Sequence, residues 1–258
     1  MTVDLAANAT PKAANVWAIG SGKGGVGKTW FSITLAHALA KASQKCLLFD
    51  ADFGLANVHI QLGHNAERDL GTVIAGKVSL KGAVTRIEET GFDVVVGRSG
   101  SGSLANLPAN RLMGLRSDLI DLAAGYDTVL IDLGAGVERS VRMISAQAGR
   151  YLVVTNDEPT ALTDAYAFIK LTTMFDPDCD IRIVINMAES VREGDTTFQT
   201  LLKACQGFLK IEPKLAGIIR RDPKVKEAIR QQAPLLQRYP GCKAAEDVMA
   251  IAQRLRQG

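Results

Sequence analysis

The sequence predicts an α/β protein with a doubly wound, mainly parallel sheet and helices on both faces, giving three layers. Short apolar runs that suit buried strands alternate with helical stretches from one end of the chain to the other. The length of 258 residues and the hydrophobic fraction of 47% suit one large domain. We expect a short flexible lead over residues 1–15 and a single domain over 16–258, because no repeat, coiled coil or linker divides the chain.

The element predictions rest on apolar runs of four to six residues for strands and on longer stretches of helical spacing. About seven strands are expected, at residues 16–19, 46–49, 92–96, 126–131, 151–154, 181–185 and 215–219. Longer helices are expected at residues 31–40, 111–124, 137–148, 161–174, 196–205, 223–230 and 243–256. Short helical pieces are expected at 69–76 and 80–87, and a Gly- and Ser-rich loop at 97–107.

A glycine-rich stretch lies between the first expected strand and the first expected helix. Gly22 to Thr29 has the pattern Gly-x4-Gly-Lys-Thr, which is typical of a phosphate-binding loop in this strand-to-helix context. The loop N–H groups would surround the phosphates at a helix N-terminus, with the Lys28 ammonium on the β- and γ-phosphates and the Thr29 hydroxyl on Mg²⁺. The predicted nucleotide-binding residues here are Gly24, Gly25, Val26, Gly27, Lys28, Thr29 and Trp30. The alternative, a glycine-rich turn with a chance Lys-Thr, does not account for the flanking strand and helix.

Carboxylates end two of the expected strands. Asp50 and Asp52 follow the second strand, and Asp132 ends the fourth. The carboxyl ends of parallel strands face the ligand crevice of such a sheet, where acids hold Mg²⁺ or orient a water molecule. We therefore expect a metal site that includes Thr29, Asp50 and Asp132. An Asp-Gly turn would explain one acid after the second strand but not two.

A second lysine makes the loop more specific. Lys23 precedes Lys28 by five residues, and the form Lys-Gly-Gly-Val-Gly-Lys-Thr resembles the deviant Walker motif of the MinD/ParA group of P-loop ATPases. The resemblance implies that Lys23 and Lys28 are both catalytic, and that Lys23 reaches across a dimer to the partner's nucleotide. The alternative for Lys23 is a solvated loop lysine.

The same resemblance assigns roles further along the chain. It implies that Asp52 positions the hydrolytic water, that Asp50 lies near the metal, that Glu158 makes a cross-dimer contact and that Asn186 reads the adenine. An amide suits the last role because it donates and accepts hydrogen bonds at once. The alternative for Asn186 is a residue that ends a strand for structural reasons.

Four longer stretches resemble the FlhG/FleN branch of the group, at residues 50–63, 97–107, 158–166 and 222–234. The resemblance implies a cytoplasmic, ATP-dependent dimerising switch that hydrolyses ATP with Mg²⁺ and controls flagellar number or placement. The implied partners are a second copy of the chain and a flagellar GTPase, regulator or switch component, which could recruit the protein to a pole or to the membrane. The chain departs from the branch at His59, Leu133 and Asn156–Asp157, and its first residues lack the branch's GTPase-activating element.

The charge distribution leaves two alternatives open. From Lys203 onward the chain has twelve Lys and Arg against five Asp and Glu, although the net charge of the whole chain is only +3. A basic C-terminal quarter would suit nonspecific DNA binding by a ParA-like positioning ATPase, or it is simply a solvated face. The other alternative is a scaffold that binds ATP and hardly hydrolyses it. We expect weak membrane binding, because the apolar face of the last helix is needed by the fold.

Overall fold

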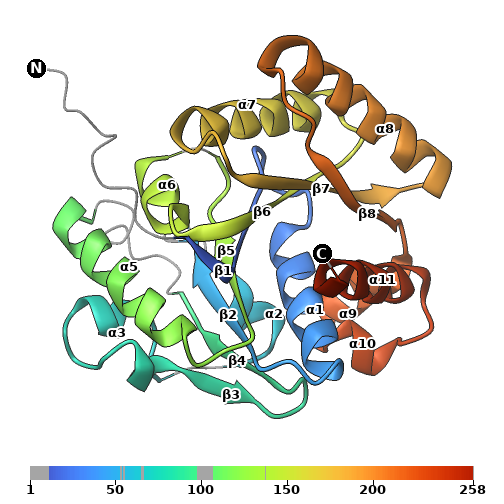
Figure 1. Ribbon diagram of the computed structural model, residues 1–258. Coiled ribbons are helices and arrows are strands. Elements are labelled where there is room, and N and C mark those ends of the chain that lie inside the picture. Colours follow the sequence, from blue (N-terminus) through green and yellow to red (C-terminus); the bar gives the residue numbers. More distant parts are fainter. Residues whose placement is uncertain are drawn as a thin grey trace, which may run out of the picture.

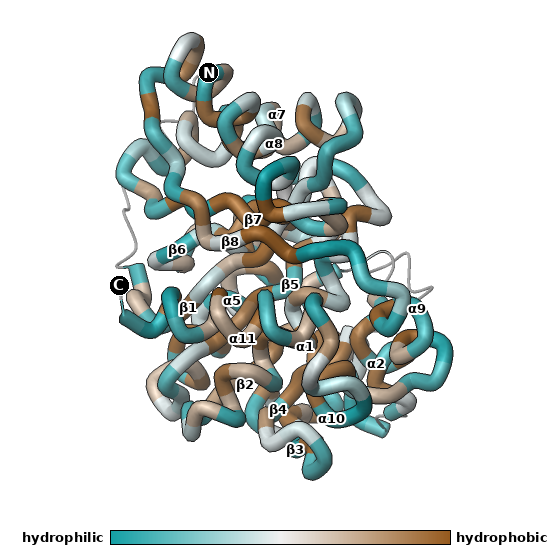
Figure 2. Tube along the Cα trace, turned by 90° about the vertical axis from the view of Figure 1, so that its right-hand side faces the viewer, coloured by the Kyte–Doolittle hydropathy of each residue, from teal (hydrophilic) through white to brown (hydrophobic). Residues whose placement is uncertain are grey.

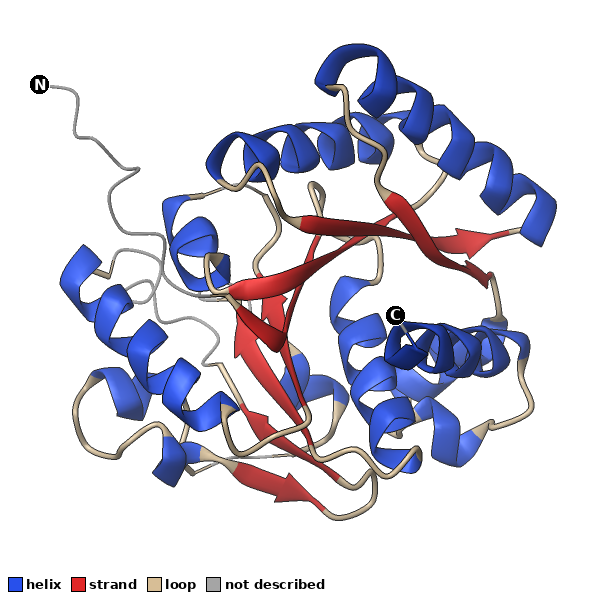
Figure 3. Cartoon of the chain, in the orientation of Figure 1, coloured by secondary structure: helices blue, strands red, loops and turns tan. Residues whose placement is uncertain are grey.

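The computed structural model describes residues 12–52, 54, 56–64, 67–97, 107–136 and 138–257. An eight-stranded sheet lies between two layers of helices (Figures 1 and 3), in the strand order β3-β4-β2-β5-β1-β6-β7-β8. All neighbouring strands are parallel except β3 and β4. The predicted fold class is therefore confirmed. The strands are β1 Ala13–Gly20, β2 Cys46–Ala51, β3 Thr85–Ile87, β4 Phe92–Val95, β5 Thr128–Leu133, β6 Ala148–Thr155, β7 Asp180–Ala188 and β8 Lys214–Arg220.

The helices divide between the two faces of the sheet. Buried side chains of α5 and α8 and most of those of α7 join one core cluster, and those of α1, α10 and α11 join the other. The helices are α1 Lys28–Lys41, α2 Val58–Gln61, α3 Leu70–Ile74, α5 Ala109–Ala123, α6 Arg139–Ser145, α7 Pro159–Phe175, α8 Val191–Ala204, α9 Pro223–Arg230, α10 Leu235–Arg238 and α11 Lys243–Gln257. A 3-10 turn covers Lys81–Ala83, and a π-helical turn covers Cys205–Leu209. Within the described ranges, no helix has the length and apolar character needed to cross a membrane.

The two cores follow from the alternation of side chains along each strand. In β1, Val16 and Ala18 belong to one cluster, whereas Trp17 and Ile19 belong to the other. Successive strand residues point to opposite faces, so a strand that is covered on both faces is apolar throughout. In Figure 2 the hydrophobic colouring runs along β7, which lies inside the molecule.

Several predicted boundaries are wrong. Residues 85–87 form β3 instead of a helical piece, because Thr85 and Ile87 are β-branched and pair antiparallel with β4, where Arg86 Nη1 lies 3.0 Å from Asp93 Oδ1. Strand β1 begins at Ala13, inside the expected lead, because the Ala13 N–H donates to the Gln147 carbonyl at 2.9 Å. Residue 148 starts β6 instead of ending a helix. The expected loop at 97–107 lies outside the described residues except at its two ends.

The topology brings the candidate residues to one edge of the sheet. Strand β1 lies between β5 and β6, and the loop that follows it leaves from the middle of the sheet. In the strand registers, Asp132 is opposite Ile19 of β1 on one side and Asp50 of β2 on the other. Both acids therefore lie at the carboxyl edge, next to the glycine-rich loop.

Candidate functional site

The glycine-rich loop is fixed by a contact from β7. Gly27 caps α1 with a left-handed backbone (φ 87°), and a Cβ at this position would lie 2.3 Å from Asn186 Nδ2. Only glycine meets both conditions without strain. Asn186 Nδ2 donates to the Val26 carbonyl at 2.8 Å, and Asn186 Oδ1 accepts from the Met187 N–H at 2.9 Å. Asn186 therefore holds the loop in the structure. The adenine contact that the resemblance implies for its amide stays a prediction.

Lys28 lies at the bottom of the site in an ion pair with Asp132. The two side chains are 7% and 1% exposed, and Lys28 Nζ is 2.9 Å from Asp132 Oδ1. Ser32 Oγ donates to the same oxygen at 2.7 Å, and the other oxygen, Asp132 Oδ2, is buried without a hydrogen-bond partner among the described residues. A buried carboxylate oxygen needs a donor or a cation. This oxygen is therefore free to accept one.

A second buried carboxyl group lies beside the first. Asp50 is fully buried, and burial together with the neighbouring Asp132 raises the Asp50 pKa to about 7. Its Oδ1 accepts from the Asp52 N–H at 3.2 Å, which ties this acid to the backbone of the segment after β2. Oxygen ligands from carboxylates and a hydroxyl are those that Mg²⁺ prefers. Asp50, Asp132 and the half-buried Thr29 carry oxygen atoms of the kind that fit Mg²⁺.

A cavity of about 480 Å³ opens above this edge of the sheet. Most of the predicted site residues line it, namely Lys23, Gly24, Gly25, Gly27, Lys28, Thr29, Trp30, Asp52 and Asn186. Four predicted residues do not line it. Val26, Asp50 and Asp132 are buried, and Glu158 is an exposed residue. The cavity volume suits a small-molecule ligand.

Sequence reasoning missed the apolar wall of this cavity. Its apolar side chains are those of Met187, Ile219, Val225 and Ile229, and the wall adjoins the loop, because a Cβ at Gly27 would lie 3.3 Å from the Met187 side chain. An apolar slot beside a phosphate cradle suits a flat aromatic base. The Asp-Pro-x-Val pattern that starts α9 was a signal for this wall, because Val225 belongs to it.

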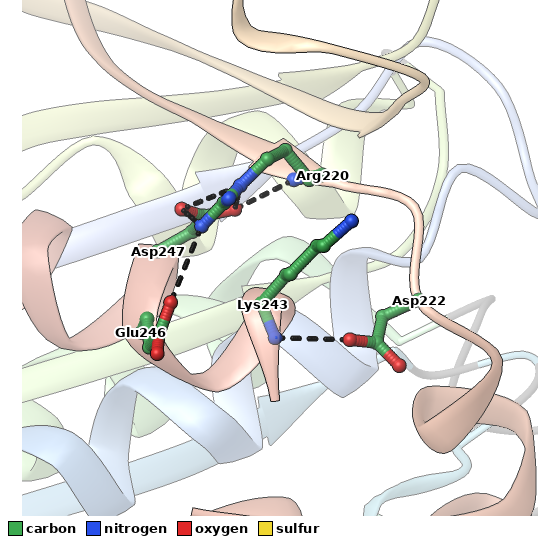
Figure 4. A network of polar contacts seen from close by, with 5 residues as sticks. All are labelled: Arg220, Asp222, Lys243, Glu246 and Asp247. Atoms are coloured by element: carbon green, nitrogen blue, oxygen red, sulfur yellow. Dashed lines mark hydrogen bonds and ion pairs between the residues drawn. The ribbon is translucent and has the colours of Figure 1, made fainter. Parts of the chain in front are cut away.

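The wall is held in place by a polar network at the end of β8 (Figure 4). The Arg220 guanidinium binds Asp247 of α11 through two nitrogens, at 2.9 Å and 2.8 Å. Asp222 accepts from the Lys224 N–H at 2.9 Å, which caps α9, and from the Lys243 N–H at 3.0 Å. Since Arg220 is bound to Asp247, its charge serves the fold, and the start of α9 is joined to α11.

Lys23 lies at the rim of the cavity and has different partners from Lys28. Its Nζ is 2.7 Å from Glu158 Oε2 and 2.8 Å from Thr160 Oγ1, at the start of α7 of the same chain. Lys23 lowers the pKa of Glu158 through the hydrogen bond and through its charge. The pair is exposed, at 36% and 56%, so water and salt weaken it. The two lysines of one loop are thus separated into a buried one and one at the surface.

A phosphate-binding loop follows β1, and buried acids lie at the carboxyl ends of β5, which neighbours β1, and of β2, which neighbours β5. This arrangement defines a P-loop ATPase. The chain belongs to the CobQ/CobB/MinD/ParA nucleotide-binding family, whose model matches residues 17–235. This membership confirms the resemblance that was noted from the sequence.

Two relatives and one solved structure illustrate what the chain is similar to. The antiactivator FleN of Pseudomonas aeruginosa is 37% identical over 240 residues, covering 93% of this chain and 85% of FleN. The flagellum site-determining protein YlxH of Helicobacter pylori is 28% identical over 236 residues, covering 91% of this chain and 79% of YlxH. The structure of MinD with Mg-ADP from Pyrococcus horikoshii has a TM-score of 0.79 at 23% identity, covering 94% and 96% of the two chains.

Proposed function

We propose that the protein is an ATP-dependent switch that dimerises on binding Mg-ATP and hydrolyses it to separate again. The observation that carries this proposal is the division between the two loop lysines. Lys28 is buried at the bottom of the cavity, where one cation suffices for the bound phosphates, and Lys23 lies at the rim. The exposure of Lys23 at the rim supports a contact with a nucleotide held by a second copy of the chain.

The residues of this chain would share the work as follows. Lys28 and the N–H groups at the start of α1 hold the phosphates and the charge that develops on them. Asp132, Asp50 and Thr29 would hold Mg²⁺, which would supply positive charge to neutralise the phosphates. Asp52 lines the cavity and orients the attacking water through its carboxylate. Asn186 would keep the loop in shape for this arrangement through its bond to the loop carbonyl.

Under this proposal, dimerisation requires Lys23 to exchange its hydrogen bonds within the chain for contacts with the partner's nucleotide. In the single chain its ammonium is bound to Glu158 and Thr160. We infer that these bonds break when a partner's nucleotide arrives, since the phosphates offer a more concentrated negative charge than one exposed carboxylate. Glu158 is then available for a contact across the interface, as the resemblance implied.

The biological output that we propose is control of flagellar number or placement. The support comes from the relatives, since FleN is named an antiactivator and YlxH a flagellum site-determining protein. Under this proposal the protein acts in the cytoplasm, and the ATP-bound dimer binds a flagellar GTPase, regulator or switch component. Hydrolysis then serves as a timer for that complex.

A pair of variants tests whether Lys28 and Lys23 have the separate roles that we propose. Lys28→Ala removes the cation at the phosphates and should weaken ATP binding, by about 10²-fold, the scale of a charge-assisted bond. Lys23→Ala should bind ATP with the affinity of the native chain but remain monomeric and hydrolyse little. Isothermal titration measures binding, and light scattering measures mass. ATP-dependent dimerisation of Lys23→Ala at the native level would contradict the proposal.

DNA binding through the basic C-terminal quarter remains an alternative. Some of its cations are already bound, since Arg220 pairs with Asp247 and Lys224 with Glu227 at 2.7 Å. Nonspecific DNA binding depends steeply on salt. A DNA complex that forms only with ATP and weakens steeply with salt would favour this alternative over the flagellar one.

A further inference from the structure

Gln232, in the turn between α9 and α10, makes a contact with α2. Its Nε2 donates to the Ile60 carbonyl at 2.9 Å, over 172 positions of the sequence. Its backbone is left-handed (φ 51°), which is uncommon for a residue other than glycine. This backbone belongs to the C-terminal cap of α9, in which the Gln232 N–H donates to the Ile229 carbonyl at 3.1 Å and the Ala233 N–H donates to the Ala228 carbonyl at 3.0 Å. The capped turn holds the Gln232 side chain next to α2.

The turn after α2 is shaped to receive it. Gly63 has a left-handed backbone (φ 61°), and a Cβ there would lie 3.2 Å from the Cβ of Gln232. A side chain at this position would be strained and would press on Gln232. The two turns thus meet closely, with one hydrogen bond between them. We refer to the contact of Gln232 with Ile60 and Gly63 as the bracket.

The bracket joins two elements that border the same cavity. Asn57 and Gln61 line it from the side of α2, and Val225, Lys226 and Ile229 line it from the side of α9. The start of α9 is held by α11 through the network at Arg220 and Asp222 (Figure 4). Helix α2 has only four residues. The firmly held α9 is therefore the support, and α2 is the element that it positions.

Helix α2 also continues the segment that carries Asp52. Five residues separate Asp52 from Val58, the first residue of α2, and Asp50 contacts both ends of this segment. Asp50 Oδ1 accepts from the Asp52 N–H at 3.2 Å, and Asp50 Oδ2 accepts from the Val58 N–H at 3.4 Å. A displacement of α2 would consequently also move the carboxylate of Asp52, which lines the cavity.

We propose that Gln232 is a positioning residue for the nucleotide reaction. Through the bracket, it holds α2 against the α9 wall, so that a base bound in the apolar slot and the Asp52 segment are aligned together. The inference rests on the proposed nucleotide function, because it concerns the same cavity. Gln232 itself touches neither the phosphates nor the water and acts through α2.

The test shortens the side chain without disturbing the turn. Gln232→Asn cannot span the distance to the Ile60 carbonyl, and Asn accepts a left-handed backbone readily. The matched control is Gln231→Asn, one residue earlier and also exposed. Release of N-methylanthraniloyl-ADP is followed by stopped flow, and single-turnover hydrolysis of ATP is followed by phosphate release. Thermal unfolding monitors the fold.

We expect Gln232→Asn to release the probe about three- to tenfold faster and to hydrolyse ATP more slowly, the range for loss of one hydrogen bond. Gly63→Ala, which disturbs the bracket from the other side, should act in the same direction. Native release and turnover in Gln232→Asn would overturn the inference, as would an equal effect in Gln231→Asn or a change confined to thermal stability. Failure of the native chain to bind the probe would instead refute the proposed function.

Discussion

The buried carboxyl pair beneath the loop should make the nucleotide-free protein less stable as the pH rises. Asp50 has an ordinary pKa of 3.8, and in the folded chain it is raised to about 7 by burial first and by Asp132 second. Because the folded-state pKa of Asp50 lies above its unfolded value, the contribution of this group to the free energy of unfolding is fully present below pH 4. That contribution is lost as the pH rises to about 7. At about 1.36 kcal/mol per pKa unit, the full loss is about 4 kcal/mol.

The substitution Asp50→Asn removes this loss, because an amide does not ionise while its oxygen still accepts hydrogen bonds. The variant should be more stable than the native chain at high pH, and about 2 kcal/mol of the gain should develop between about pH 5.5 and pH 8.5. Urea unfolding in EDTA without nucleotide measures the free energies. Asp195→Asn, an exposed change on α8, serves as the control and should follow the native pH dependence. An Asp50→Asn variant whose stability has the native pH slope would refute the reasoning.

Three further results are expected. Asp52→Ala should keep ATP binding but hydrolyse ATP about 10²-fold more slowly, the scale of a lost general-base or positioning group. Phosphate release measures the rate, and a native rate would exclude this role of Asp52. Gly27→Ala should lower the midpoint of thermal unfolding, because its Cβ would lie 2.3 Å from Asn186 Nδ2. Gly24→Ala should not, because a Cβ there meets nothing within 4 Å, and equal midpoints for the two variants would contradict the geometry. Little of the isolated protein should co-sediment with liposomes of anionic lipid in the presence of ATP. Strong co-sedimentation would show that a membrane-binding face is available.

The parts of the site that the sequence predicted are local ones. The loop from Gly22 to Thr29 and the acids Asp50 and Asp132 have short motifs whose meaning depends only on the adjacent strand and helix. Strand ends of a parallel sheet meet at one edge, so the register of Asp50 opposite Asp132 follows from the same pattern.

The contacts that the sequence could not predict join distant segments. Lys23 with Glu158 and Gln232 with Ile60 are separated by 135 and 172 positions, and no local pattern specifies such a pair. The edge strand β3 was missed for a related reason, since three residues carry too little periodicity and the pairing with β4 decides their conformation.

The dimer is the central claim, and the mass of Asp52→Ala in solution tests it most directly. This variant should hold Mg-ATP without hydrolysing it, so the ATP-bound state accumulates. Size-exclusion chromatography with light scattering should give twice the mass of one chain with Mg-ATP and the mass of one chain with Mg-ADP. Adding Lys23→Ala to the variant should return it to one chain in both nucleotides. A single-chain mass for Asp52→Ala in saturating Mg-ATP would contradict the account.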